Sequence, residues 1–117
     1  MAEKGTEEVV KNFKLTMGVL RKELPETAET LLNLIRTVHK EGALSPKEKE
    51  LICVGISIAI GCETCIVMHT KAALEAGATK EEIMEVFGVA LTLRGSSAIG
   101  HVSIGINVIN ELSSKQI

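Results

Sequence analysis

Two cysteines and a histidine stand at spacings that suit redox chemistry, in the stretch Gly61-Cys62-Glu63-Thr64-Cys65-Ile66-Val67-Met68-His69. On a helix of about 3.6 residues per turn, Cys62, Cys65 and His69 fall within roughly 60° of one another around the axis. A Cys-x-x-Cys pair can close into a disulfide. A histidine one turn beyond the second cysteine can take its proton and favour the thiolate, which is the nucleophilic form. The spacing therefore makes thiol redox chemistry the first hypothesis.

Two other interpretations of the same residues stay open. Cysteine is among the most buried residue types, so the pair could act as small apolar fillers on a helix. The three side chains could also supply ligands to a structural zinc ion. Structural zinc usually takes four ligands from two separated pairs, however, and the remaining candidates, Cys53, His39 and His101, are isolated in the sequence. Zinc is therefore the weaker alternative, and the sequence predicts neither a metal nor a bound cofactor.

Composition points to one small all-α domain that spans residues 1–117. The chain is 45% hydrophobic but only 2% aromatic, with neither Trp nor Tyr, so its core must be built from aliphatic side chains. Helix-on-helix packing suits that composition. A domain of this size leaves much of its apolar surface uncovered as a monomer, so we expect association into an oligomer.

Charge and hydropathy exclude several classes of function. The formal net charge of −2 offers no basic surface for nucleic acid. The polar start, residues 1–5, lacks the features of a secretory signal, so the cytoplasm is the expected location. The apolar run 51–60 is too short to span a membrane, and the longer tract 86–109 contains Arg94 and His101. In a reducing compartment, a Cys-x-x-Cys pair is catalytic or metal-binding more often than structural.

Local signals predict five or six helices and no strand. Thr6, followed by two acids, is expected to cap a helix that runs to about residue 22. Pro25 begins a second helix that ends at Gly42. Its apolar positions fall on one stripe, which we expect to be buried. The members of that stripe are Ala28, Leu31, Leu32, Ile35 and Val38.

The middle of the chain carries the clearest boundaries. Ser45 and Glu48 form a capping-box pattern that starts a helix from 46 to about 60, apolar nearly all round beyond its first turn. Gly61 separates this helix from one that carries both cysteines over 62–76, and Gly77 is typical of the position after a helix end. Thr79 caps a fifth helix. The small residues of 95–105 predict either a loop or a closely packed final helix.

Glu50 is the remaining candidate for the site. If the helices on either side of Gly61 fold back as an antiparallel hairpin, Glu50 lies opposite about residue 72, one turn from His69. A carboxylate there could orient the imidazole or relay its proton. A solvated first-turn acid, favoured by the helix dipole, explains Glu50 equally well on spacing alone.

These residues resemble the alkylhydroperoxidase AhpD-like family of the carboxymuconolactone decarboxylase superfamily. The motif Glu-x11-Cys-x2-Cys-x3-His stands here as Glu50, Cys62, Cys65 and His69, and the stretch 69–83 is also similar to the family pattern. The resemblance implies an all-α bundle, built around an antiparallel helix pair that carries the cysteines, with subunits assembled into trimers or hexamers. It also implies a thiol peroxidase or disulfide reductase activity.

The resemblance assigns the roles residue by residue. Cys65 becomes the thiol that attacks peroxide, Cys62 the resolving partner, His69 the nearby base and Glu50 the end of a proton relay. A dithiol, dihydrolipoamide-like or a thioredoxin-like protein, would restore the thiols. The best-known peroxidase member has a second histidine where this chain has Thr64.

Other functions remain as alternatives. The decarboxylase side of the superfamily acts without a Cys-x-x-Cys pair, so the two cysteines speak against that lyase activity. A non-enzymatic oligomer that senses redox state or holds metal is the other alternative. Cys53 is expected to be a small core residue, His39 a residue favoured by the dipole at a helix end, and His101 a hydrogen-bonded core or interface residue, all outside the active site.

Overall fold

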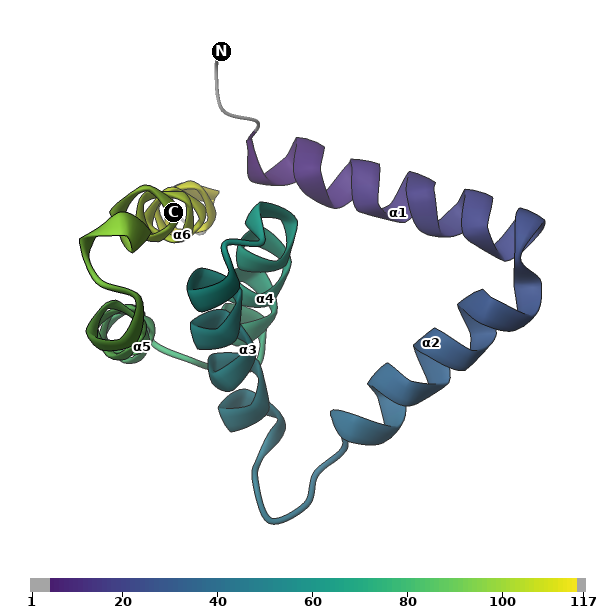
Figure 1. Ribbon diagram of the computed structural model, residues 1–117, viewed down its shortest axis with the longest axis horizontal. Helices are drawn as coiled ribbons and strands as arrows, with labels where there is room; N and C mark the ends of the chain where they lie inside the picture. The colour runs from purple at the N-terminus through teal and green to yellow at the C-terminus, as the bar shows by residue number, and fades with distance from the viewer. Residues whose placement is uncertain (1–4, 116–117) are drawn as a thin grey trace.

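The computed structural model describes residues 5–115, which form six α-helices, one short 3-10 turn and no strand (Figure 1). The elements are α1 Thr6–Glu23, α2 Pro25–Val38, α3 Pro46–Ile60, α4 Glu63–Glu75, α5 Lys80–Arg94, the 3-10 turn Ser96–Ala98 and α6 Ile99–Lys115. Within residues 5–115, no helix is both long enough and apolar enough to cross a bilayer. The all-α fold predicted from composition is confirmed.

Helices α3 to α6 form the packed part of the molecule. The antiparallel pair α3 and α4 lies at its centre, with α5 packed against α3 and α6 packed against α4 (Figure 1). The largest side chains of the core are aliphatic except for one phenylalanine, as composition predicted. Those that are fully buried include Ile58, Ile66, Ile83, Phe87 and Ile109.

Helices α1 and α2 form an arm that extends from this bundle. The two helices pack against each other, and α1 also packs against α4. Helix α1 runs outward from the bundle, and α2 runs back toward it, so that the carboxyl end of α2 is its part nearest to α3 (Figure 1). The apolar stripe predicted for α2 is therefore not buried within one chain. Only Ala28 is buried, while Leu31, Ile35 and Val38 are exposed. That expectation was wrong for the single subunit, because a stripe needs a facing element to cover it.

Of the three helix caps predicted at Thr6, Ser45 and Thr79, two are confirmed and one was wrong. Ser45 and Thr79 each close a complete capping box, as their spacing to Glu48 and Glu82 indicated. Thr6 does not cap α1. The cap residue is Gly5, and the backbone N–H of Thr6 instead donates to the Glu111 carboxylate of α6, at 2.8 Å.

The small residues of 95–105 serve both of the predicted purposes. Gly95, with φ 81°, leads into the turn Ser96–Ala98, and α6 begins directly afterwards. Further along α6, Gly105 lies against the ring of Phe87 on α5. The segment is therefore a short turn followed by a closely packed helix.

Candidate active site

The two cysteines lie at the reversal between α3 and α4. Gly61 ends α3 in the left-handed conformation, at φ 71° and ψ 33°, which L side chains rarely adopt. The N–H of Cys62 then donates to the Ser57 carbonyl at 3.1 Å, so the chain turns tightly back on α3. This turn brings the Cys-x-x-Cys motif to the amino-terminal end of α4.

Cys62 is the cap residue of α4 rather than its first helical residue. Its backbone is extended, and its sulfur accepts the backbone N–H of Cys65 at 3.2 Å. The expectation that the helix includes Cys62 was therefore wrong by one position. The shift places both sulfurs at the positive end of the helix dipole, where a thiolate is stabilised.

Cys62 and Cys65 are joined by a disulfide in this structure, with their Cα atoms 5.2 Å apart. Both residues are half-buried. Cys53 is the only cysteine among the described residues that carries a free thiol. The filler interpretation does not fit a bonded pair, because small apolar fillers need no covalent partner.

Glu50 reaches His69 across the α3–α4 hairpin. Its Oε2 lies 2.8 Å from Nδ1 of His69, although the residues are 19 positions apart in the chain. The exposed fraction is 17% for the Glu50 side chain and 32% for His69. With Nδ1–H donating to the carboxylate, Nε2 of the ring is left as the proton acceptor. Glu50 is thus not a solvated first-turn acid, and the predicted hairpin geometry is confirmed.

His39 belongs to the same cluster, which the sequence prediction did not foresee. Its Nδ1 lies 3.2 Å from the other Glu50 oxygen, Oε1. The rings of His39 and His69 are stacked, with centroids 6.3 Å apart and planes at 8°. His39 follows the last residue of α2, so it reaches Glu50 only because the end of α2 returns to α3. Nothing in the local pattern around residue 39 signals that contact.

Cys53 lies one helical turn after Glu50, at the edge of this cluster. Its Sγ is 4.0 Å from Nε2 of His39. Burial raises the pKa of the Cys53 thiol, and the nearby Glu50 carboxylate raises it further. Cys53 is therefore held as a thiol, less reactive than an ordinary cysteine, and it is half-buried rather than a core filler.

Arg94 and His101 support the turn that carries the cysteines. One guanidinium nitrogen of Arg94 donates to the Ile58 carbonyl at 2.8 Å and lies 2.7 Å from Nδ1 of His101. A Cβ at Gly61 would lie 3.2 Å from Cε1 of His101. The prediction of a hydrogen-bonded histidine at 101 is confirmed, and its ring lies directly behind the turn.

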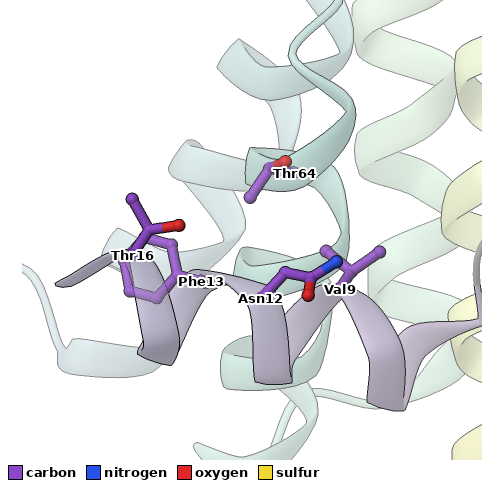
Figure 2. Close-up of a pocket in the computed structure, with 5 residues that line it drawn as sticks. All are labelled: Val9, Asn12, Phe13, Thr16 and Thr64. Atoms are coloured by element: carbon purple, nitrogen blue, oxygen red, sulfur yellow. The ribbon is translucent and has the colours of Figure 1, made fainter. Parts of the chain in front are cut away.

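A shallow pocket of about 270 Å³ lies between α1 and the start of α4 (Figure 2). Thr64, which stands between the two cysteines, forms one wall, and the side chains that face it come from successive turns of α1 (Figure 2). The α1 residues that line the pocket are Val9, Asn12, Phe13 and Thr16. A mixed apolar and hydroxyl-bearing surface thus borders the motif.

Comparison with known proteins places the chain in a family. The family model described as "Carboxymuconolactone decarboxylase family" matches residues 25–103. The chain belongs to this family. The matched region includes Glu50, Cys62, Cys65 and His69. The predicted resemblance to the AhpD-like family of the superfamily is confirmed by the family model, an AhpD relative and a solved structure of the family.

Relatives and solved structures agree with this assignment. An uncharacterized protein of the cox locus of Paracoccus denitrificans is 36% identical over 84 residues, covering 72% of this chain and 76% of that protein. Alkyl hydroperoxide reductase AhpD of Corynebacterium kroppenstedtii is 26% identical over 68 residues, covering 58% of this chain but only 39% of that protein. A carboxymuconolactone decarboxylase family protein of Legionella pneumophila superposes with a TM-score of 0.88 at 29% identity, over 92% of this chain and 96% of that chain.

Proposed function

We propose that this carboxymuconolactone decarboxylase family protein is a thiol-dependent peroxidase or disulfide reductase. The observation that carries the proposal is the Glu50–His69 contact, one helical turn from Cys65, combined with the Cys62–Cys65 disulfide. An oriented imidazole beside a cysteine at a helix start is an arrangement that activates thiols. The similarity to an alkyl hydroperoxide reductase supports the same chemistry.

The first step is attack by Cys65. Nε2 of His69 takes the thiol proton, and Glu50 holds the ring by accepting from Nδ1. The thiolate sulfur attacks one peroxide oxygen and the O–O bond breaks, so Cys65 becomes a sulfenic acid and the other oxygen leaves as alcohol or water. The thiol is oxidised and the peroxide is reduced, with the histidine supplying the proton to the departing oxygen.

The second step closes the disulfide. The Cys62 sulfur attacks the sulfenic sulfur and expels water, which gives the Cys62–Cys65 bond seen in the structure. An external dithiol, dihydrolipoamide-like or a thioredoxin-like protein, then reduces this bond through a mixed disulfide and is itself oxidised. If the protein acts as a disulfide reductase, the reduced Cys62–Cys65 pair reduces a disulfide substrate by the same exchange. The proposed cycle uses no bound cofactor.

A peroxide-consumption assay with several dithiol donors tests the proposal. We expect hydrogen peroxide or an organic hydroperoxide to be consumed when dihydrolipoamide or reduced thioredoxin is supplied, and Cys65→Ser to abolish that consumption. As a matched control, Glu81→Gln changes an exposed first-turn acid on α5 and should retain activity. Absence of turnover with every donor would overturn the proposal. Decarboxylation of a carboxylated lactone by the Cys62→Ser, Cys65→Ser double variant would instead establish the lyase.

A further inference from the structure

We propose that His39, Glu50 and Cys53 form a binding site for a thiophilic divalent cation, with zinc as the best-fitting ion. The three residues are scattered in the sequence, but one ligand atom from each lies within 4.8 Å of the other two. Glu50 and Cys53 are three residues apart and so share one face of α3. The end of α2 brings His39 over that face.

The donor set selects the ion. A thiolate, an imidazole and a carboxylate are all common zinc ligands, whereas magnesium and calcium prefer oxygen alone. In a tetrahedral zinc site, sulfur and nitrogen ligands are about 3.6 Å apart, given bonds of about 2.3 and 2.0 Å. The Cys53 Sγ and His39 Nε2 atoms are 4.0 Å apart, and the other ring nitrogen, Nδ1, faces Glu50. Because one ligand atom from each residue already lies within 4.8 Å of the others, a small shift of the imidazole and carboxylate would bring all three onto one ion.

Charge and exposure also suit a cation. Binding replaces the Cys53 thiol proton with the metal and releases that proton to solvent, so two anionic ligands then balance the two positive charges. The side chains of His39 and Glu50 are 23% and 17% exposed, which leaves the site open to ions from solution yet partly shielded from water. Three protein ligands leave a fourth position for water or a small ligand.

The site shares Glu50 with the proposed relay. His39 lies against Oε1 of Glu50 and His69 against Oε2. A cation on the His39 side would draw negative charge away from the carboxylate that holds His69, so the ion should slow the reaction of Cys65. This consequence rests on the proposed function, whereas the binding site itself does not. The cation would thus act as an inhibitor of the relay through Glu50.

Cobalt(II) provides a direct test in the oxidised protein. With Cys62 and Cys65 bonded to each other, Cys53 is the one remaining cysteine of the three. A thiolate-to-cobalt charge-transfer band in the near ultraviolet must therefore arise from Cys53. We expect this band to saturate at one cobalt per chain, to disappear when zinc is added, and to be absent from Cys53→Ser.

Matched histidine variants identify the second ligand. His39→Gln should weaken cobalt and zinc binding by at least about tenfold, because loss of even an outer-shell partner of a metal ligand costs about 10–100-fold in affinity. His101→Gln, which changes a half-buried histidine outside the cluster, should leave the affinity unchanged. No charge-transfer band, or equal affinities for the His39 and His101 variants, would overturn the site.

The inhibitory role needs a separate measurement. Zinc should slow peroxide consumption by the unmodified protein, and the fractional slowing should be much smaller in Cys53→Ser, each protein being compared with its own zinc-free rate. Equal fractional slowing would place the inhibition at the reduced Cys62–Cys65 pair and overturn the role assigned to this site. Because cobalt binding is measured without turnover, failure of the metal site and failure of the peroxidase proposal are distinguishable.

Discussion

Gly105 of α6 lies against the aromatic ring of Phe87 on α5, so closely that a Cβ at position 105 would come within 2.9 Å of Cε1. Phe87 is 1% exposed and belongs to the core that joins α5 and α6 to the central helix pair. The ring is surrounded by packed side chains and has little room to move. The absence of a side chain at 105 therefore sets how closely the last helix can approach.

Gly105→Ala should destabilise the protein by about 1–3 kcal/mol, the usual cost of overpacking a core. Gly88→Ala is the matched control, because Gly88 lies within α5 and a Cβ there would meet nothing within 4 Å. That control should be neutral or stabilising by about 0.5–1 kcal/mol, since alanine is the better helix former. Urea unfolding followed by circular dichroism measures both. Equal effects of the two variants would show that the ring of Phe87 gives way.

The starts of α2, α3 and α5 could be predicted from the sequence because the signals that set them are local, whereas α2 ends at Val38 and not at the predicted Gly42. Ser45 and Thr79 each bond the third residue of their own helix, and Gly61 and Gly77 adopt positive φ at the two ends of the motif helix. For Glu50, hairpin geometry predicted a place near His69, but spacing alone explained a solvated acid equally well, and the family resemblance decided between the two. Such inferences need only a short stretch of chain.

What could not be predicted depends on the angle between distant elements. His39 reaches Glu50 only because of where the arm of α1 and α2 returns to α3. The start of α1 is held by Glu111, which is 105 residues away from Thr6. No local pattern encodes such contacts, so the site's second histidine was missed and the α1 cap was misassigned.

The two capping boxes should make stability depend on acid. Hydrogen bonds from Ser45 hold the pKa of Glu48 below its usual range, and those from Thr79 and Lys47 do the same for Glu82. A carboxyl whose pKa is lower in the folded state gives stability that is present above its unfolded pKa and is lost as pH falls through the folded one. Stability should therefore decline below a pH of about 4.5, the reference value for both carboxyls.

Thermal unfolding between about pH 6 and pH 3 tests this dependence. In Glu48→Gln and Glu82→Gln the acid-induced loss of stability should be smaller than in the unmodified protein. Glu81→Gln is the control, because Glu81 also lies in the first turn of α5 but takes no part in the capping box, which is formed by Thr79 and Glu82. The same acid response in all four proteins would contradict the role of the caps.

Helix α2 predicts an oligomer in solution. Four large apolar side chains of α2 are 42–59% exposed, namely Leu31, Leu34, Ile35 and Val38. Within residues 5–115, the main helix that packs against α2 is α1. Contiguous apolar surface of this kind is typical of interfaces, and closed symmetry is the usual outcome. We expect a homo-oligomer, a trimer or hexamer as the family resemblance implies, when light scattering is measured at micromolar concentration. Leu34→Glu should lower the measured mass, whereas a monodisperse monomer of the unmodified protein would refute the prediction.

Thiol labelling should distinguish the three cysteines. After peroxide treatment we expect one free thiol per chain, Cys53, and after reduction by a dithiol we expect three. Proximity favours closure of the Cys62–Cys65 pair, and the raised pKa of Cys53 slows its oxidation. Mass spectrometry of labelled peptides identifies the free residue. A bridge that includes Cys53, or three free thiols after peroxide, would contradict the assignment.

The Glu50–His69 contact should control the reactivity of Cys65 in the reduced protein. Glu50→Gln preserves size but removes the charge that holds the imidazole, so alkylation of Cys65 near pH 7 should slow. Loss of general-base help lowers rates by about 10²–10⁴-fold, and His69→Ala should cost as much or more. The double variant should be little worse than His69→Ala alone, because the effects of two members of one relay are not additive.

Mass spectrometry of the Cys65 peptide against time and pH gives these alkylation rates, with Glu81→Gln as the control. Unchanged reactivity in Glu50→Gln, or fully additive losses, would show that Glu50 only braces the two histidines and that no relay operates.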